Sequence, residues 1–148
     1  MSHCLSSNMN SGSKNNKGGN MISQLLCHLI GDYVLQSSWM ANNKTKCWLP
    51  AIAHATAYSL PFLIGFRPSL SAMAVIAGTH LLIDRFRLVR YVAYANQFLS
   101  PPCEVKTWAD CSGTGYHKDT PAWLAVWLMI IVDNTMHLAI NALALAYL

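Results

Sequence analysis

Seven histidine and aspartate residues lie inside the most apolar stretches of this sequence, and six of them form pairs spaced four residues apart. The set comprises His28, Asp32, His54, His80, Asp84, Asp133 and His137. An ionisable side chain at membrane depth costs about 2.5–3.5 kcal/mol on insertion scales, so a set of this size requires a compensating interaction. A shared metal ion would supply it, because imidazole nitrogens and carboxylate oxygens are common metal ligands.

The ligand types restrict which ion would bind. Imidazole and carboxylate together favour a divalent transition metal, zinc first with manganese or iron as alternatives, over calcium or magnesium. The five cysteines contain no C-x-x-C pair, which disfavours a structural zinc site of the cysteine type. Seven candidates exceed the four ligands of a tetrahedral zinc site, so either two ions bind or some aspartates orient the histidine rings.

Five candidates come from the pairs with the clearest pattern. We expect His28, His80 and His137 to be direct ligands. Asp32 and Asp133 follow as further ligands or as the catalytic residues, since a carboxylate left free of the metal could act as general base. An incompletely ligated metal ion would then activate water for cleavage of an ester or phosphoester.

Two candidates rank behind these. His54 stands alone, and a single histidine in a helix is often a hydrogen-bonded core residue. Asp84 lies beside Arg85 and Arg87 and could simply pair with them. For the set as a whole, a proton or ion relay and a network of charge pairs that only holds helices together are the alternatives to a metal site.

The composition indicates which elements position these residues. Of the 148 residues, 53% are hydrophobic and 11% are charged, which is less than half of the charge of an average soluble protein. The sequence therefore predicts an all-α polytopic membrane protein, a bundle of about four transmembrane helices. Since a spanning helix needs about 20 mostly apolar residues, we expect spans at about 21–40, 47–66, 69–88 and 121–147.

The remaining segments divide the chain. Residues 1–20 are rich in Ser, Asn and Gly and are expected to be a disordered polar tail, with translation from Met21 as an alternative start. Residues 21–148 form the membrane domain, in which about 100–120 is a polar loop. The span 21–40 carries several polar residues, so whether it fully crosses the membrane stays open. Beyond Asp84 the third span is expected to continue as an amphipathic helix to about Phe98.

Lys and Arg residues concentrate near the loops that follow the first and third spans, which places both termini outside the cytoplasm. In this topology the first and third spans run the same way and read His then Asp, whereas the last runs the opposite way and reads Asp then His. The pairs can therefore meet in one zone, with histidines at one level and aspartates at the next.

The expected partners follow from the same placement of charge. The lipid bilayer is the first, and a group at the cytoplasmic headgroup level could bind anionic phospholipid. That group comprises Arg85, Arg87, Arg90, Tyr91 and Tyr94. Ordinary interfacial anchoring is the alternative. The net charge of +4 is explained by positive residues at the span edges, so we expect no nucleic-acid partner.

One string matches a known pattern. His28-Leu-Ile-Gly-Asp32-Tyr33-Val-Leu-Gln36, followed by Trp39-Met40-Ala41 and Lys44, resembles the signature of a family of small bacterial and phage membrane proteins that is a domain of unknown function. The later His/Asp pairs are similar to that family's later blocks, so the resemblance covers about 21–148. Asn134 stands where the family generally has Gln. The His and Asp helices are more distantly similar to inner-membrane proteins considered metal-dependent hydrolases.

The resemblance implies a bacterial or phage protein of the inner membrane. Together with the residues, it leads to the hypothesis of a metal-dependent hydrolase that acts on a lipid or another membrane-accessible ester or phosphoester. A non-enzymatic membrane protein that modifies the host envelope or binds a host membrane protein is the alternative, and a proton or metal-ion carrier is the third.

Overall fold

The computed structural model describes residues 21–148, and these confirm the all-α prediction. The predicted tail 1–20 lies outside the described residues. The helical elements, with π and 3-10 helices marked η, are α1 (Met21–Leu29), η1 (Ile30–Val34), α2 (Ser38–Asn43), α3 (Trp48–Phe66), α4 (Leu70–Phe86), α5 (Val89–Ala95), η2 (Asn96–Leu99), η3 (Pro102–Glu104), α6 (Trp108–Cys111) and α7 (Ala122–Tyr147).

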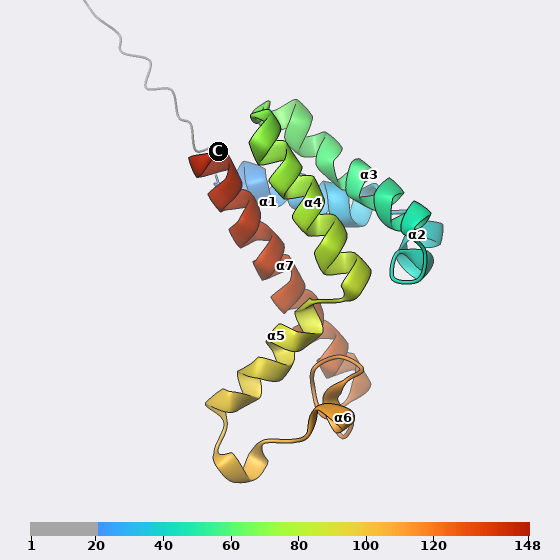
Figure 1. Ribbon diagram of the computed structural model, residues 1–148, viewed down its shortest axis with the longest axis vertical. Coiled ribbons are helices and arrows are strands. Elements are labelled where there is room, and N and C mark those ends of the chain that lie inside the picture. The colour runs from blue at the N-terminus through green and yellow to red at the C-terminus, as the bar shows by residue number, and fades with distance from the viewer. Residues whose placement is uncertain (1–20) are drawn as a thin grey trace, which may run out of the picture.

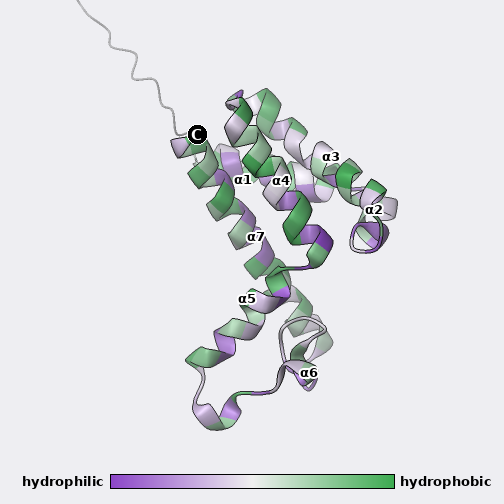
Figure 2. Ribbon diagram, viewed as in Figure 1, coloured by the Kyte–Doolittle hydropathy of each residue, from purple (hydrophilic) through white to green (hydrophobic). Residues whose placement is uncertain are grey.

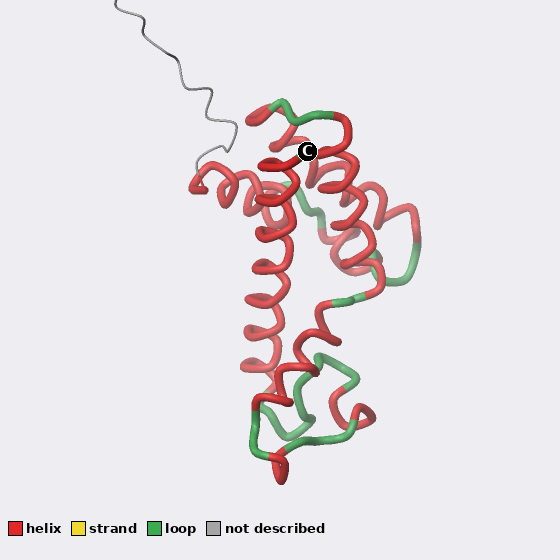
Figure 3. The backbone as a smooth tube through the Cα atoms, turned by 60° about the vertical axis from the view of Figure 1, so that its left-hand side comes forward, coloured by secondary structure: helices red, strands yellow, loops and turns green. Residues whose placement is uncertain are grey.

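Three long helices form the body of the molecule. α3 and α4 run side by side in opposite directions, and α7 packs along α4 (Figure 1). α1 runs across the direction of α7 rather than along it, both in this view and in the turned view of Figure 3. The end of α7 returns to the turn between α3 and α4, where Ser69 Oγ donates a hydrogen bond of 2.8 Å to the Leu148 carbonyl.

The helix boundaries follow the expected spans in three of four places. Those expected at 47–66, 69–88 and 121–147 correspond to α3, α4 and α7. The stretch 21–40 is instead divided among α1, the π-helical η1 and the start of α2. This first stretch is thus a broken element that packs across α3 and α7.

The expected continuation of the third helix to Phe98 is interrupted at Arg87. Arg87 adopts a left-handed conformation with φ of 50°, and the N–H groups of Arg87 and Leu88 bond back to the carbonyls of Asp84 and Ile83. This pattern is a Schellman motif, which closes a helix by satisfying its last carbonyls. The chain therefore turns before α5 begins, and α5 lies against α7 at a different angle from α4 (Figure 1).

The residues that α7 buries are small or polar, whereas its large apolar residues face outward. The buried residues are Ala125, His137, Asn141 and Ala144. Trp127 and Ile131 are 61% and 56% exposed. Figure 2 shows α7 as largely hydrophobic along its length, with hydrophilic positions near its middle. On α3 and α4 large apolar residues lie on both sides, since Leu63 is 52% exposed whereas Phe62 and Ile76 are buried. The arrangement on α7, with small and polar residues inside and large apolar residues outside, suits lipid surroundings, where helices associate through small and hydrogen-bonding residues.

Two of the described helices, α3 and α7, are long and apolar enough to cross a membrane, which by itself is weak support for membrane association. α4 has 17 residues and is shorter than these two. The prediction of four membrane spans therefore stays a prediction.

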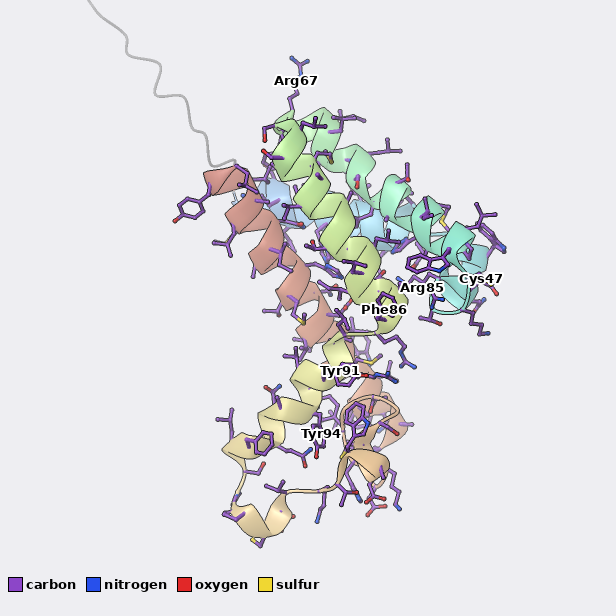
Figure 4. The ribbon with its side chains drawn as sticks, viewed as in Figure 1. Cys47, Arg67, Arg85, Phe86, Tyr91 and Tyr94 are labelled. Atoms are coloured by element: carbon purple, nitrogen blue, oxygen red, sulfur yellow. The ribbon has the colours of Figure 1, made fainter. Side chains whose placement is uncertain are left out.

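The predicted polar loop folds into a small unit with α5. Tyr91 stacks on Trp108 with ring centroids 4.9 Å apart, and Tyr94 Oη donates to the Lys106 carbonyl. Figure 4 shows both tyrosines on the side of α5 that faces this loop. Hydrogen bonds from Lys118 and Thr107 hold the pKa of the Asp110 carboxyl below its usual value. The loop is therefore ordered and packs against α5.

Candidate metal centre

Asp32 reaches the centre of the molecule because η1 approaches α3 very closely. Gly31 lies directly against the backbone of Tyr58, and a Cβ added at Gly31 would lie 2.7 Å from the Tyr58 carbonyl oxygen. Only a glycine fits at that distance. The π-helical turn widens the backbone at this point, and such turns often occur at functional sites. Asp32 is consequently buried although it follows an amphipathic surface helix.

The helix pair α3–α4 contributes three further groups. His54 comes from α3, and His80 and Asp84 lie four residues apart on α4, so the two share one face. All three are buried. Because α3 and α4 run side by side, these three side chains converge on the Asp32 carboxylate from η1.

The first group of ligand atoms comprises Asp32, His54, His80 and Asp84. Nε2 of His54 lies 3.0 Å from Nε2 of His80 and 3.2 Å from Oδ1 of Asp32. Oδ2 of Asp84 lies 3.0 Å from His54 Nε2 and 3.4 Å from His80 Nε2. His80 Nε2 lies 3.9 Å from Asp32 Oδ1.

These separations fit a tetrahedral metal ion. Zinc binds histidine and carboxylate at about 2.0–2.1 Å, so the ligand atoms of a tetrahedral site lie about 3.3 Å from one another. The five distances above range from 3.0 to 3.9 Å. The four atoms are thus close enough to hold a metal ion, and their side chains already point inward to do so.

A second group adjoins the first. It comprises Asp84, Asp133 and His137. His137 Nε2 lies 3.4 Å from Asp84 Oδ1 and 3.6 Å from Asp133 Oδ1. Asp84 therefore belongs to both groups and offers one oxygen to each. Histidines and aspartates are interleaved here and do not form the two separate levels that the helix directions suggested.

Lys44 is a member of this site that the sequence reasoning did not assign. It ends α2, and its Nζ donates a hydrogen bond of 2.6 Å to Asp84 Oδ2 and lies 3.1 Å from His54 Nε2. The ammonium partly neutralises the two carboxylates of the first group. Lys44 follows the string from His28 to Gln36 that resembles the family signature, and this position could have pointed to it. The residues around Lys44 do not by themselves distinguish it from Lys46.

His28 lies outside both groups, and its role as a direct ligand stays a prediction. Its ring is fully buried and engaged at both nitrogens. Nε2 donates to Asn134 Oδ1 at 3.0 Å, and Nδ1 lies 2.9 Å from Tyr58 Oη. Since Asn134 offers an oxygen, Nδ1 is the acceptor and Tyr58 is the donor.

Tyr58 connects this network to the metal groups. Its hydroxyl accepts a hydrogen bond of 2.6 Å from Asn141 Nδ2, and its ring stacks on His80 with centroids 3.6 Å apart. Sequence reasoning missed both Tyr58 and Asn141. The four-residue spacing could have found them, because Tyr58 follows His54 and Asn141 follows His137 at that interval.

The comparisons with known proteins identify a family and nothing closer. The pattern of the family described as "Protein of unknown function (DUF3307)" matches residues 21–147. No curated protein and no solved structure matches the chain. The match confirms the resemblance to a family of unknown function that the His28–Gln36 string suggested.

Proposed function

The chain belongs to the DUF3307 family of proteins of unknown function, and we propose that it is a membrane-embedded, metal-dependent hydrolase of a lipid or another ester or phosphoester at the membrane. The observation that carries the proposal is the convergence of four ligand atoms, from η1, α3 and α4, at separations that match one tetrahedral ion. The Lys44 ammonium offsets only part of the charge of the carboxylates Asp32 and Asp84, and a bound metal ion would offset the remaining cost of burying them.

The proposed ligands are the members of the two groups. Asp32, His54, His80 and Asp84 would hold one divalent transition-metal ion, zinc before manganese or iron. His137 and Asp133 adjoin it through Asp84 and would either complete its coordination or hold a second ion. The ion would supply Lewis-acid activation of water and of the ester oxygen.

Where one ion binds and Asp133 stays free of it, Asp133 is the proposed general base. Its side chain is 24% exposed, whereas that of Asp84 is 7% exposed. Asp133 also borders a cavity beside the cluster. A carboxylate that touches both the ligand set and an open space is placed to take a proton from a water molecule.

His28 is proposed as a positioning residue. Through Tyr58 it fixes the ring that stacks on His80, and through Asn134 it contacts the residue beside Asp133. Hydrogen bonds from residues that do not contact the metal orient the rings that do, and their loss typically costs 10- to 100-fold in metal affinity or activity. This role replaces direct ligation as the proposal for His28.

The membrane setting is supported by the reversed polarity of α7 and by the two helices long enough to cross. We propose a multi-pass protein of the bacterial inner membrane, with the Lys44 and Arg85 end of the bundle toward the cytoplasm. At that end Arg85 donates to the carbonyls of Thr45 and Lys46, so the loop after α2 lies against the last turn of α4.

Metal analysis of the detergent-purified protein tests the proposal. We expect at least one equivalent of zinc in the wild type, less than a tenth in His54→Ala, and wild-type content in the loop control His117→Ala. Metal-replete Asp133→Asn should then lose hydrolysis of ester or phosphoester substrates. A wild type without stoichiometric metal overturns the proposal.

The charge-pair alternative has one observation in its favour, the contact of Lys44 with Asp84. In that case the cluster would only hold helices together, and the purified protein would be equally stable after exhaustive chelation. Under the proposal, chelation lowers the thermal midpoint and added zinc restores it, because a ligand that binds the folded state stabilises it.

A further inference from the structure

A small cavity lies beside the metal groups at the point where α4 ends and α5 begins. Its volume is about 170 Å³, and Asp84 and Asp133 are among the residues that line it. A water molecule occupies about 30 Å³ in the liquid, so the cavity has room for a small polar group and a few waters. It is too small for a whole lipid, which leaves the headgroup as the part that would enter.

Two cations also line this cavity, Lys44 and Arg87. Arg87 is held there by the left-handed turn that closes α4 and by hydrogen bonds of its Nη2 to the Gly113 carbonyl and, at 3.9 Å, to Met129 Sδ. Within the described residues, its Nε and Nη1 make no hydrogen bond. A planar guanidinium with unused donors binds a tetrahedral oxyanion well.

The balance of charge makes anion binding depend on the metal. Asp32, Asp84 and Asp133 outnumber Lys44 and Arg87 by one charge, so the metal-free site repels an anion. A divalent ion held by the carboxylates would reverse the sign of the site. It would also compete with Lys44 for Asp84, and Lys44 already lines the cavity, so its ammonium would be available to an anion there.

We propose that this cavity binds the phosphate group of the substrate, with Arg87 and Lys44 as its ligands, and that the enzyme therefore acts on phosphoesters rather than on carboxyl esters. The inference rests on the proposed function, since it assigns the substrate class of the same site. A neutral carboxyl ester would gain little from two cations when it binds, because it carries a negative charge only in the transition state of its hydrolysis. Phosphate oxygens gain a charge-assisted hydrogen bond from each.

The test uses zinc-loaded full-length protein in detergent, inorganic phosphate as the probe, and calorimetric titration. Arg87→Gln should weaken phosphate binding about tenfold or more, the loss expected for a hydrogen bond between charged groups. Arg67→Gln is the matched control, because Arg67 also closes a helix in the left-handed conformation, with φ of 47°, but at the opposite end of the bundle (Figure 4). It should bind phosphate as the wild type does.

Arg87→Lys is a second variant that controls for a folding defect. It keeps the positive charge but replaces the planar guanidinium with an ammonium. It should weaken phosphate binding less than Arg87→Gln. A second experiment, with phosphatidic acid in mixed micelles, tests whether the phosphate group belongs to a lipid. Tighter binding of phosphatidic acid than of inorganic phosphate indicates a lipid phosphoester, and equal binding indicates a water-soluble one. Both results support the site.

The outcomes separate the two proposals. If zinc content is stoichiometric in every variant and Arg87→Gln binds phosphate as the wild type does, the phosphate site is overturned while the metal centre stands. If the wild type holds no zinc, the metal centre fails and the phosphate site fails with it.

Discussion

The ammonium of Lys44 lies 2.6 Å from Oδ2 of Asp84, so a residue at the end of a six-residue helix reaches the carboxylate that both groups of ligand atoms share. The same oxygen lies 3.0 Å from His54 Nε2. A lysine side chain thus stands where a metal ion would also need to contact Asp84. The site has an internal cation that competes with the external one.

Replacing this lysine should therefore strengthen metal binding. In Lys44→Met the competition for Asp84 is removed, and we expect the zinc dissociation constant to fall about tenfold, the equivalent of about 1.4 kcal/mol. The metal-free variant should unfold at a lower temperature, because Asp84 is buried without its partner. Competition with a chromogenic chelator measures the affinity. Lys46→Met is the control, and weaker zinc binding in Lys44→Met would show that Lys44 supports the metal instead.

The close approach of η1 to α3 should not tolerate a larger residue. Gly31→Ala would place a Cβ 2.7 Å from the Tyr58 carbonyl oxygen and 2.9 Å from its Cα. We expect a loss of about 1–3 kcal/mol in stability, as for other overpacked sites, and a loss of zinc because Asp32 moves with the helix. Thermal unfolding in detergent measures the first effect.

Gly78→Ala provides the matched control. Gly78 also lies in a helix, but apart from its chain neighbours and the backbone of its own helix no atom lies within 4 Å of a Cβ added there. Alanine should be neutral or stabilising by up to about 1 kcal/mol because of its higher helix propensity. Equal behaviour of the two variants would mean that the approach of η1 to α3 is looser than the structure has it.

The hydroxyl of Tyr58 should contribute to metal affinity without contacting the metal. Tyr58→Phe keeps the ring that stacks on His80 but leaves His28 Nδ1 and Asn141 Nδ2 without this partner. We expect a destabilisation of about 1–3 kcal/mol and zinc binding weaker by about 10-fold or more. Tyr147→Phe, at an exposed position, should match the wild type. Unchanged zinc affinity in Tyr58→Phe would limit this hydroxyl to a structural role.

The proposed topology predicts which cysteines face the cytoplasm. Cys47 and Cys103 are both exposed. Cys47 follows Lys46, which Arg85 contacts, and Cys103 lies in η3, in the segment between α5 and α7 that the proposed topology puts on the same side of the membrane. In single-cysteine variants, a membrane-impermeant maleimide should label both from the cytoplasmic side. Leu70→Cys, 88% exposed at the other end of α4, should be labelled from the opposite side. Labelling of Cys47 and Cys103 from different sides would contradict the arrangement.

The sequence alone determined the pairs and the long helices. His80 with Asp84, and Asp133 with His137, share helix faces because residues four apart always do. Long apolar stretches predicted α3, α4 and α7 to within a few residues, since hydropathy and helix capping are local properties. These local rules also led to the all-α fold and to a polar cluster in the interior.

The tertiary structure decided which of these residues meet. His54 and Asp84, ranked behind the others in the sequence, lie at the centre, whereas His28, ranked first, is held by Tyr58 and Asn134. The depth and rotation of each helix are set by contacts between elements distant in the sequence, such as Gly31 against Tyr58. Lys44 enters the site for the same reason, because the path of the chain after η1, and not its local pattern, carries its ammonium to Asp84.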